Sequence, residues 1–185
     1  MADKKAPWLD EAKKHEGKSE YDSKFRAYMS GFWKIVGLPN YKTIVGTSFA
    51  WCGLFVAAML YTKGLPWQKN GAGARNWAKY GQAIDWKKNG IPRGAIIHIN
   101  HKEQCASGSG NHVAFANGDC TAADLAKPNS TIELYGGNQG NRAKVSVYST
   151  DEVCAVRWPP GLDLPEPVKV STGCNGKSAD KESTR

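Results

Sequence analysis

The first part of the chain spaces its apolar residues as helices do. Residues 7–16 start with a proline and place acids before lysines, an order that suits the helix dipole, and Gly17 follows. From residue 21 to 36 apolar side chains recur every three or four positions, with Asp22 in place for an N-cap. We therefore expect helices over 7–16 and 21–36, the second amphipathic, and then a loop over 37–47.

The following stretch is the most apolar in the chain. No polar side chain interrupts residues 53–60, which predicts a helix that is buried on most sides. Cys52 lies in the first turn of this predicted helix, where a polar loop ends. A further short helix is expected over 72–80.

Beyond residue 92 the pattern becomes that of β-strands. Runs rich in β-branched and aromatic residues cover 95–99, 111–116, 131–135, 143–148 and 153–158. Helices followed by strands predict an α+β fold in which N-terminal helices pack on a C-terminal antiparallel β-sheet. We assign residues 1–159 to this domain and residues 160–185, rich in proline and then in lysine, serine and glycine, to an irregular or flexible tail.

The length of the apolar runs and the net charge limit which kinds of partner the protein can have. The longest apolar run, 53–60, is too short to cross a bilayer, and no apolar run follows the N-terminus, so we expect neither stable membrane insertion nor a cleaved signal peptide. A net charge of +8 favours a polyanion such as nucleic acid, anionic lipid or an anionic envelope polymer. The lysines are scattered and form no arginine-rich stripe, which argues against nucleic acid.

The chain has five cysteines. If Cys52 is reserved for chemistry, an even number remains, which can form two disulfides in an oxidising compartment. The sequence leaves their pairing open; these residues are Cys105, Cys120, Cys154 and Cys174.

A nucleophilic site is the sharpest hypothesis for Cys52. Unpaired N–H groups and the positive dipole end at a helix start favour thiolate over thiol. A cysteine nucleophile also needs a base and a group that orients the base. His112, at the start of a predicted strand, and Asn138, after two glycines, are the candidates, and Ser48 is a candidate oxyanion donor.

Each of these residues also has an ordinary structural interpretation. Cys52 can equally be a buried small hydrophobe. His112 can be a core histidine, Asn138 a residue of a hairpin turn, and Ser48 a helix cap. Taken one by one, none of them identifies an enzyme.

Four blocks in consistent order carry a resemblance to a family. They are Trp-Cys-Gly-Leu-Phe-Val at 51–56, Gly-Asn-His-Val-Ala-Phe at 110–115, Gly-Gly-Asn-Gln at 136–139 and Val-Arg-Trp-Pro at 156–159. Together they resemble the papain-like peptidoglycan amidohydrolases of the CHAP and NlpC type. The sequence departs from that pattern at Asn111 and in the insertions near Cys105 and Cys120.

The resemblance implies a papain-like fold and a cysteine peptidase or amidase that needs no cofactor. Cys52 would be the nucleophile, His112 the general base and Asn138 the orienting residue. Ser48, Trp51 and Gln139 would contact substrate or the oxyanion.

The implied substrate is bacterial peptidoglycan, cleaved at an amide of the peptide stem or cross-link as an endopeptidase or an N-acetylmuramoyl-L-alanine amidase. Such an antibacterial enzyme would be made in the cytoplasm and act in the periplasm or cell wall. It would be delivered as a type VI secretion effector, with an immunity protein in the producing cell, or as a phage endolysin.

Two alternatives belong to other functional classes. One is a zinc site built from His98, His101, Cys105 and His112, although their spacing matches no zinc pattern. The other is a non-catalytic wall-binding module in which Cys52 is structural.

Overall fold

The protein forms an α+β fold, as the order of helices and strands predicts. The computed structural model describes residues 6–46, 50–101, 105–106 and 108–174. Its helices are α1 (Pro7–Lys13), α2 (Ser23–Ser30), α3 (Cys52–Thr62), α4 (Trp86–Asn89) and α5 (Ala122–Leu125). Its 3₁₀ segments are η1 (Trp33–Val36), η2 (Ala74–Lys79) and η3 (Thr150–Glu152).

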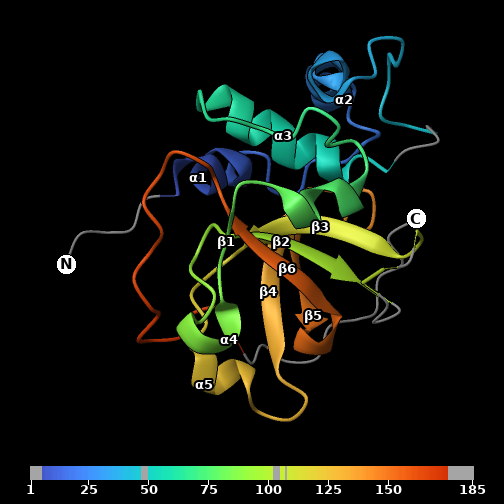
Figure 1. Ribbon diagram of the computed structural model, residues 1–185. Helices are drawn as coiled ribbons and strands as arrows, with labels where there is room; N and C mark the ends of the chain where they lie inside the picture. The colour runs from blue at the N-terminus through green and yellow to red at the C-terminus, as the bar shows by residue number, and fades with distance from the viewer. Residues whose placement is uncertain (1–5, 47–49, 102–104, 107, 175–185) are drawn as a thin grey trace.

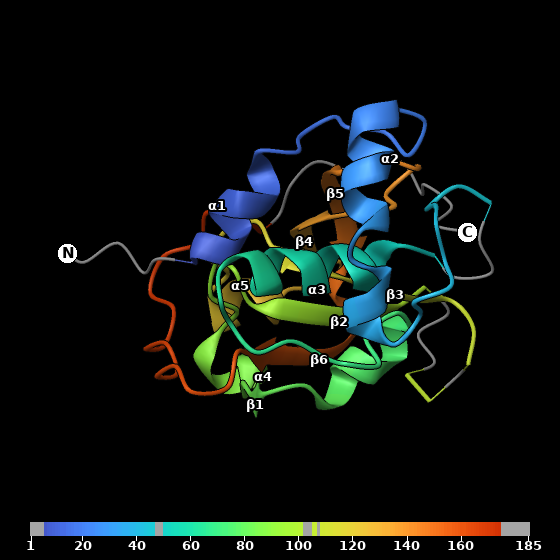
Figure 2. The same cartoon turned by 90° about the horizontal axis from the view of Figure 1, so that it is seen from above.

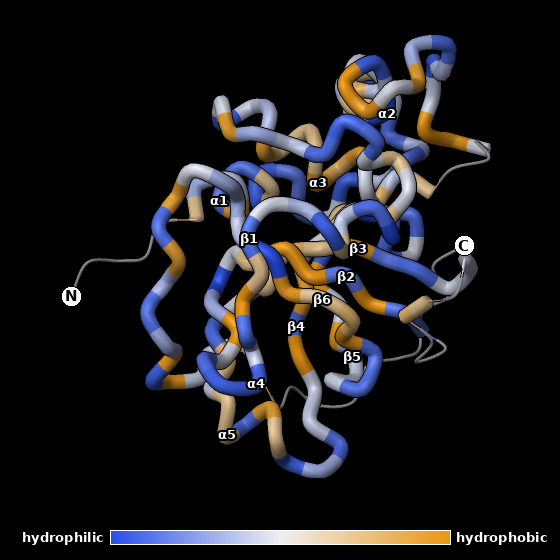
Figure 3. Tube along the Cα trace, viewed as in Figure 1, coloured by the Kyte–Doolittle hydropathy of each residue, from blue (hydrophilic) through white to orange (hydrophobic). Residues whose placement is uncertain are grey.

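The described strands form one six-stranded antiparallel sheet in the order β1-β6-β2-β3-β4-β5. They are β1 (Gln82–Ala83), β2 (Ile96–Asn100), β3 (Asn111–Ala116), β4 (Thr131–Gly136), β5 (Lys144–Ser149) and β6 (Val153–Trp158). All five strands expected from sequence are therefore confirmed, and the two-residue strand β1 is an addition. Figure 3 shows that hydrophobic residues concentrate in β2 and β6, in the interior of the sheet.

Helices α1, α2 and α3 lie together over the sheet (Figures 1 and 2). Helix α3 is buried from Cys52 to Leu60, which confirms the expectation from its apolar sequence. Gly53 permits its close approach to the next segment, because an added Cβ would overlap the carbonyl oxygen of Gly71. Helix α3 contacts β3, so the start of this helix is held against the middle of the sheet.

The helix expected over 21–36 is divided into α2 and η1. The predicted cap is present, because the Asp22 side chain accepts a hydrogen bond from the Phe25 amide. Helix α2 ends at Gly31, whose amide donates to the Tyr28 carbonyl, a tighter pattern than that of an α-helix. The apolar spacing continues past this glycine, which is why periodicity alone predicts one helix. In the same way, residues 74–79 form a 3₁₀ helix where an ordinary helix was expected.

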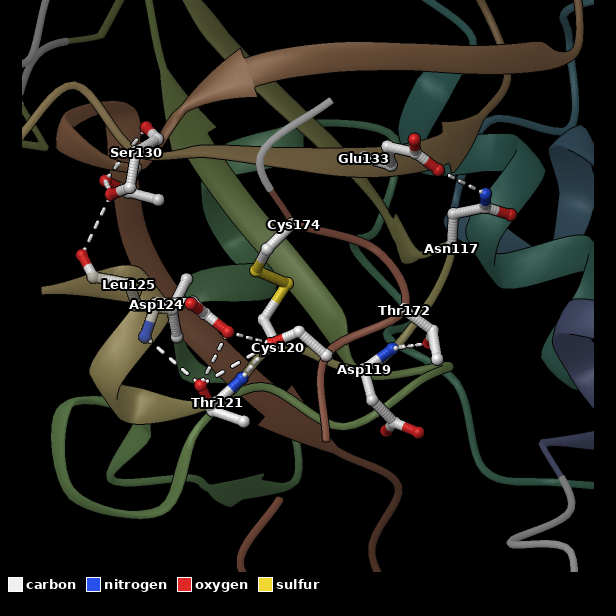
Figure 4. The surroundings of a disulfide bond; sticks show 12 residues. Asn117, Asp119, Cys120, Thr121, Asp124, Leu125, Ser130, Glu133, Thr172 and Cys174 are labelled. Carbon is white, nitrogen blue, oxygen red and sulfur yellow. Dashed lines mark hydrogen bonds between the residues drawn. A yellow bond between two sulfur atoms is a disulfide. The ribbon is translucent and has the colours of Figure 1, made fainter. Parts of the chain in front are cut away.

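Residues 160–174 have no helix or strand, yet they are attached to the body of the protein. A disulfide joins Cys174 to Cys120, and the Asp119 amide donates to the Thr172 hydroxyl. Figure 4 shows both links beside the loop that precedes α5. A second disulfide joins Cys105 to Cys154, which answers the pairing question that the sequence left open.

We predict that the double variant Cys120→Ala, Cys174→Ala has a free energy of unfolding about 4 kcal/mol below that of the wild type. The cysteines are 54 residues apart in sequence, and cross-linking a loop of this size removes much conformational entropy from the unfolded chain. Urea unfolding followed by circular dichroism measures the loss. An unchanged unfolding midpoint would show that the disulfide does not constrain the unfolded chain.

Candidate active site

Cys52 is the first residue of α3 and is only 2% exposed. Burial raises the pKa of this thiol, while hydrogen bonds from the backbone of Val113, Gly53 and Cys52 itself lower it. Burial is the largest effect, so the pKa is raised overall and the resting sulfur is a protonated thiol. The expectation that the helix start favours thiolate over thiol is therefore wrong for the resting protein, because burial outweighs the backbone hydrogen bonds.

The thiol lies beside the strand that carries His112. Its backbone partner Val113 is the residue after His112 in β3. His112 is fully buried, and its ring lies 5.7 Å from the ring of Tyr148 and 6.2 Å from that of His101, measured between centroids. The structure thus brings Cys52 and His112 to the same point of the sheet.

Gln139 holds the imidazole of His112. The Gln139 amide nitrogen donates to the carbonyls of Leu134 at 3.3 Å, Gly136 at 3.5 Å and Lys144. Because these carbonyls hold the amide nitrogen, the amide oxygen points away from them. There it accepts a hydrogen bond from the Tyr148 hydroxyl at 2.8 Å. The same oxygen lies 3.3 Å from Nε2 of His112.

This arrangement assigns the protonation state of the ring. An amide oxygen only accepts hydrogen bonds, so Nε2 of His112 carries the proton and Nδ1 carries the lone pair. Nδ1 is buried and has no hydrogen-bond partner in the described part of the chain. It is therefore the nitrogen that is free to accept a proton from a nearby thiol once the two atoms come within hydrogen-bond distance.

Burial, and to a smaller extent the neighbouring His101 and His98, lower the pKa of His112 to about 3, against the raising effect of the Gln139 hydrogen bond. The resting site thus holds a neutral imidazole beside a neutral thiol. No charge is buried until the proton moves between them.

The side chain that contacts the His112 ring is that of Gln139, the residue after Asn138. Asn138 is buried and has a φ of 60°, a left-handed conformation that asparagine tolerates in turns. Gln139, expected to contact substrate or oxyanion, instead contacts His112 and is fully buried. Gly137 precedes them because a Cβ there would overlap the ring of Trp51.

Trp51 occupies a core position, which does not support the substrate contact expected of it. Its side chain is 1% exposed, and its indole nitrogen donates to Glu20 at 2.9 Å. The ring packs against Phe25 and Phe55. Trp51 therefore fixes the start of α3, whereas Ser48, the expected oxyanion donor, lies outside the described residues.

The set proposed as a zinc alternative is divided among other interactions. Cys105 is in a disulfide with Cys154 and offers no thiolate. Nε2 of His98 lies 2.8 Å from the Asn111 side-chain oxygen. Across the described ranges, no group of three or more histidine, cysteine or acidic side chains is placed to hold a metal ion.

Sequence reasoning missed Tyr148 as a neighbour of the candidate base, whereas it grouped His101 with His112 only in the zinc alternative. Tyr148 reaches the site because β5 pairs with β4 and directs this side chain toward Gln139. His101 follows β2 and approaches Glu152 at 3.4 Å. His101 lies across the β2–β3 hairpin from His112, but Tyr148 is distant in sequence, and the strand register that brings it close is not visible in a local pattern.

Comparison with protein-family models, curated proteins and solved structures finds no match. Within the described ranges, no helix is long and apolar enough to cross a membrane.

We predict that His112 makes the protein less stable in acid. Its pKa is about 3 in the folded chain and about 6.5 when unfolded, so the unfolded chain binds more protons between these values. The contribution of His112 to stability is present above pH 6.5 and is lost as the pH falls toward 3.

In urea unfolding at pH 7.5 and 5.0, the wild type should lose about 2 kcal/mol more than His112→Phe, which cannot titrate. NMR should show no titration of the His112 ring between these pH values. A ring that titrates near pH 6.5 in the folded protein would contradict the buried neutral state.

Proposed function

We propose that this protein is a cysteine hydrolase that cleaves an amide bond of bacterial peptidoglycan. The observation that carries the proposal is the imidazole of His112, whose Nε2 is held by Gln139 and whose Nδ1 is unpartnered, next to the backbone that contacts the Cys52 thiol. A structural cysteine needs no such neighbour. The combination supplies a nucleophile, a base and an orienting group.

The proposed reaction proceeds through an acyl-enzyme. Nδ1 of His112 takes the proton from Cys52, and the sulfur attacks the carbonyl carbon of the substrate amide. The backbone N–H of Cys52, at the start of α3, stabilises the oxyanion. His112 then returns the proton to the leaving amine, and the carbon–nitrogen bond breaks. Water, deprotonated by His112, hydrolyses the thioester and releases the carboxylate product and the thiol.

The order of the four sequence blocks supports peptidoglycan as the substrate, as does the net charge of +8 on the chain. The two disulfides suit an oxidising destination such as the periplasm or cell wall. Under this proposal the enzyme reaches the wall as a type VI effector, countered by an immunity protein, or as a phage endolysin. A gene for a small exported neighbour favours the effector, and a holin gene favours the endolysin.

We predict that Cys52→Ala and His112→Ala abolish wall hydrolysis while the fold survives. The first variant removes the nucleophile, and the second removes the base, whose contribution to rate is typically 10²- to 10⁴-fold. Mass spectrometry of peptidoglycan digested with each protein measures released fragments, and their masses identify the bond. Activity retained in either variant contradicts this assignment, and a wild type that releases nothing favours the wall-binding module.

We predict opposite outcomes for the two neighbouring amides. Gln139→Met keeps the side-chain volume but removes the acceptor of His112 Nε2, so kcat should fall by roughly 10²-fold. Asn138→Gly suits the φ of 60° at this position and should leave kcat within about twofold. Both rates are measured on stem-peptide substrate, with circular dichroism to confirm folding. If Asn138→Gly is the slower variant, the orienting role returns to Asn138.

A further inference from the structure

The Cys105–Cys154 disulfide joins the two chain segments that carry neighbours of the candidate base. Cys105 comes four residues after His101, and Cys154 comes two residues after Glu152. Nδ1 of His101 is 3.4 Å from Oε2 of Glu152. The ring of His101 is stacked on that of His112, with 6.2 Å between the centroids. The disulfide is therefore linked to the candidate active site through one pair of side chains.

The strand ladder does not make this link. The pairing of β2 with β6 ends at Ile99 and Val153, and both His101 and Glu152 lie beyond that end. The His101 amide donates to the Gly110 carbonyl, which ties the main chain of His101 to the β2–β3 hairpin. The disulfide continues the connection between the hairpin and the start of β6 past the last ladder pair.

His101 is the member of a ring cluster that borders solvent. The rings of His101, His112 and Tyr148 lie 5.7 to 6.2 Å apart, with angles between their planes of 23° to 30°. The His101 side chain is 25% exposed, whereas His112 is fully buried. A displacement of the His101 ring therefore removes a packing partner from His112 and opens its surroundings to water.

We propose that the Cys105–Cys154 disulfide is a redox switch, which holds His101 against His112 when it is formed and lowers the activity when it is reduced. The inference rests on the proposed function and adds its regulation. In the reduced chain the segment that carries Cys105 is no longer bound to the start of β6, so His101 and Glu152 can separate. His112 then loses a ring that fixes its orientation, and a displacement of about 1 Å at a catalytic group costs roughly 10²-fold in rate.

This switch disulfide is accessible to a reductant, whereas the second disulfide is not. Cys105 is exposed, and Cys154 is half-buried. Cys154 also lines a cavity of about 760 Å³, together with Trp86 and other residues of α4, α5 and η3. In the second disulfide, drawn in Figure 4, Cys120 is fully buried beneath the segment that ends at Cys174. A reductant therefore meets the sulfur of Cys105 first.

The reaction uses a dithiol, the class of reductant that keeps cytosolic thiols reduced. One thiolate of the dithiol attacks the sulfur of Cys105, the S–S bond breaks, and Cys154 leaves as a thiolate and takes a proton. The second thiol of the reductant then displaces Cys105 as a thiol and closes the reductant into a cyclic disulfide. Two electrons and two protons pass to the protein, so the enzyme is weak in a reducing compartment and active in an oxidising one.

The test measures kcat and KM on a soluble stem peptide, before and after equilibration with dithiothreitol. The variant Cys120→Ala, Cys174→Ala keeps only the switch disulfide, so its kcat should fall by about tenfold or more on reduction, with KM unchanged. The matched variant Cys105→Ala, Cys154→Ala keeps only the other disulfide and should have the low kcat in both buffers. Circular dichroism in each buffer confirms that the proteins are folded.

A variant of the intermediary separates the switch from a general loss of stability. His101→Ala removes the ring through which the disulfide acts, so its kcat should be low before reduction and should change by less than about twofold after it. His101→Phe restores a ring at this position and should recover most of the rate of the oxidised protein. A purely structural disulfide would lower the rates of both variants on reduction to the same degree as in the wild type.

Each outcome decides the proposal. A peptide hydrolysed at the same rate in both buffers overturns the switch and leaves the proposed function intact. If no protein hydrolyses the peptide, the proposed function fails, and NMR of the wild type still tests the switch. The nuclear Overhauser contact between the rings of His101 and His112 should be present in the oxidised protein and lost in the reduced one. A contact that survives reduction overturns the proposal.

Discussion

The amide of Gln139 is the contact on which the candidate site depends. Its nitrogen donates hydrogen bonds to three backbone carbonyls, so the amide cannot rotate and its oxygen stays directed at His112. Without that constraint a buried imidazole could carry its proton on either nitrogen, and only one tautomer leaves Nδ1 free to act as a base. The carbonyls belong to β4 and β5, so the pairing of these two strands fixes the protonation state of a residue on β3.

Two opposing effects act on Cys52, and burial is the larger. The start of α3 and the Val113 backbone stabilise a thiolate, while the surrounding core raises the thiol pKa. His112 is shifted by the same burial in the opposite direction on the pH scale. Both groups therefore rest in their neutral forms, and the site avoids the cost of a buried ion pair before substrate arrives. When the proton moves from Cys52 to His112, the imidazole gains a positive charge. The side-chain oxygen of Gln139 faces this ring, and the Tyr148 hydroxyl donates a hydrogen bond to the same oxygen.

The sequence predicted the fold class and the strands because alternation along each strand is a local property. It predicted one helix where α2 and η1 are separate, because apolar spacing continues across Gly31. It selected Asn138 over Gln139 because both amides follow the same two glycines, and only the turn geometry decides which one faces His112. The disulfide pairs and the approach of Tyr148 depend on strand order, which no local pattern records.

One side of the helical layer faces the sheet and the other faces solvent, and α3 contains residues suited to each. Its buried residues are apolar throughout and hold Cys52 against β3, while Tyr61, near its end, reaches the surface and joins a ring from the turn after α2. An entirely apolar helix would satisfy the core alone. On the same side of the layer, Lys24, Arg26 and Lys34 of α2 and η1 form no ion pair with another described residue. The same helix thereby runs from the proposed chemistry at its buried first residue to the protein surface in its last turn.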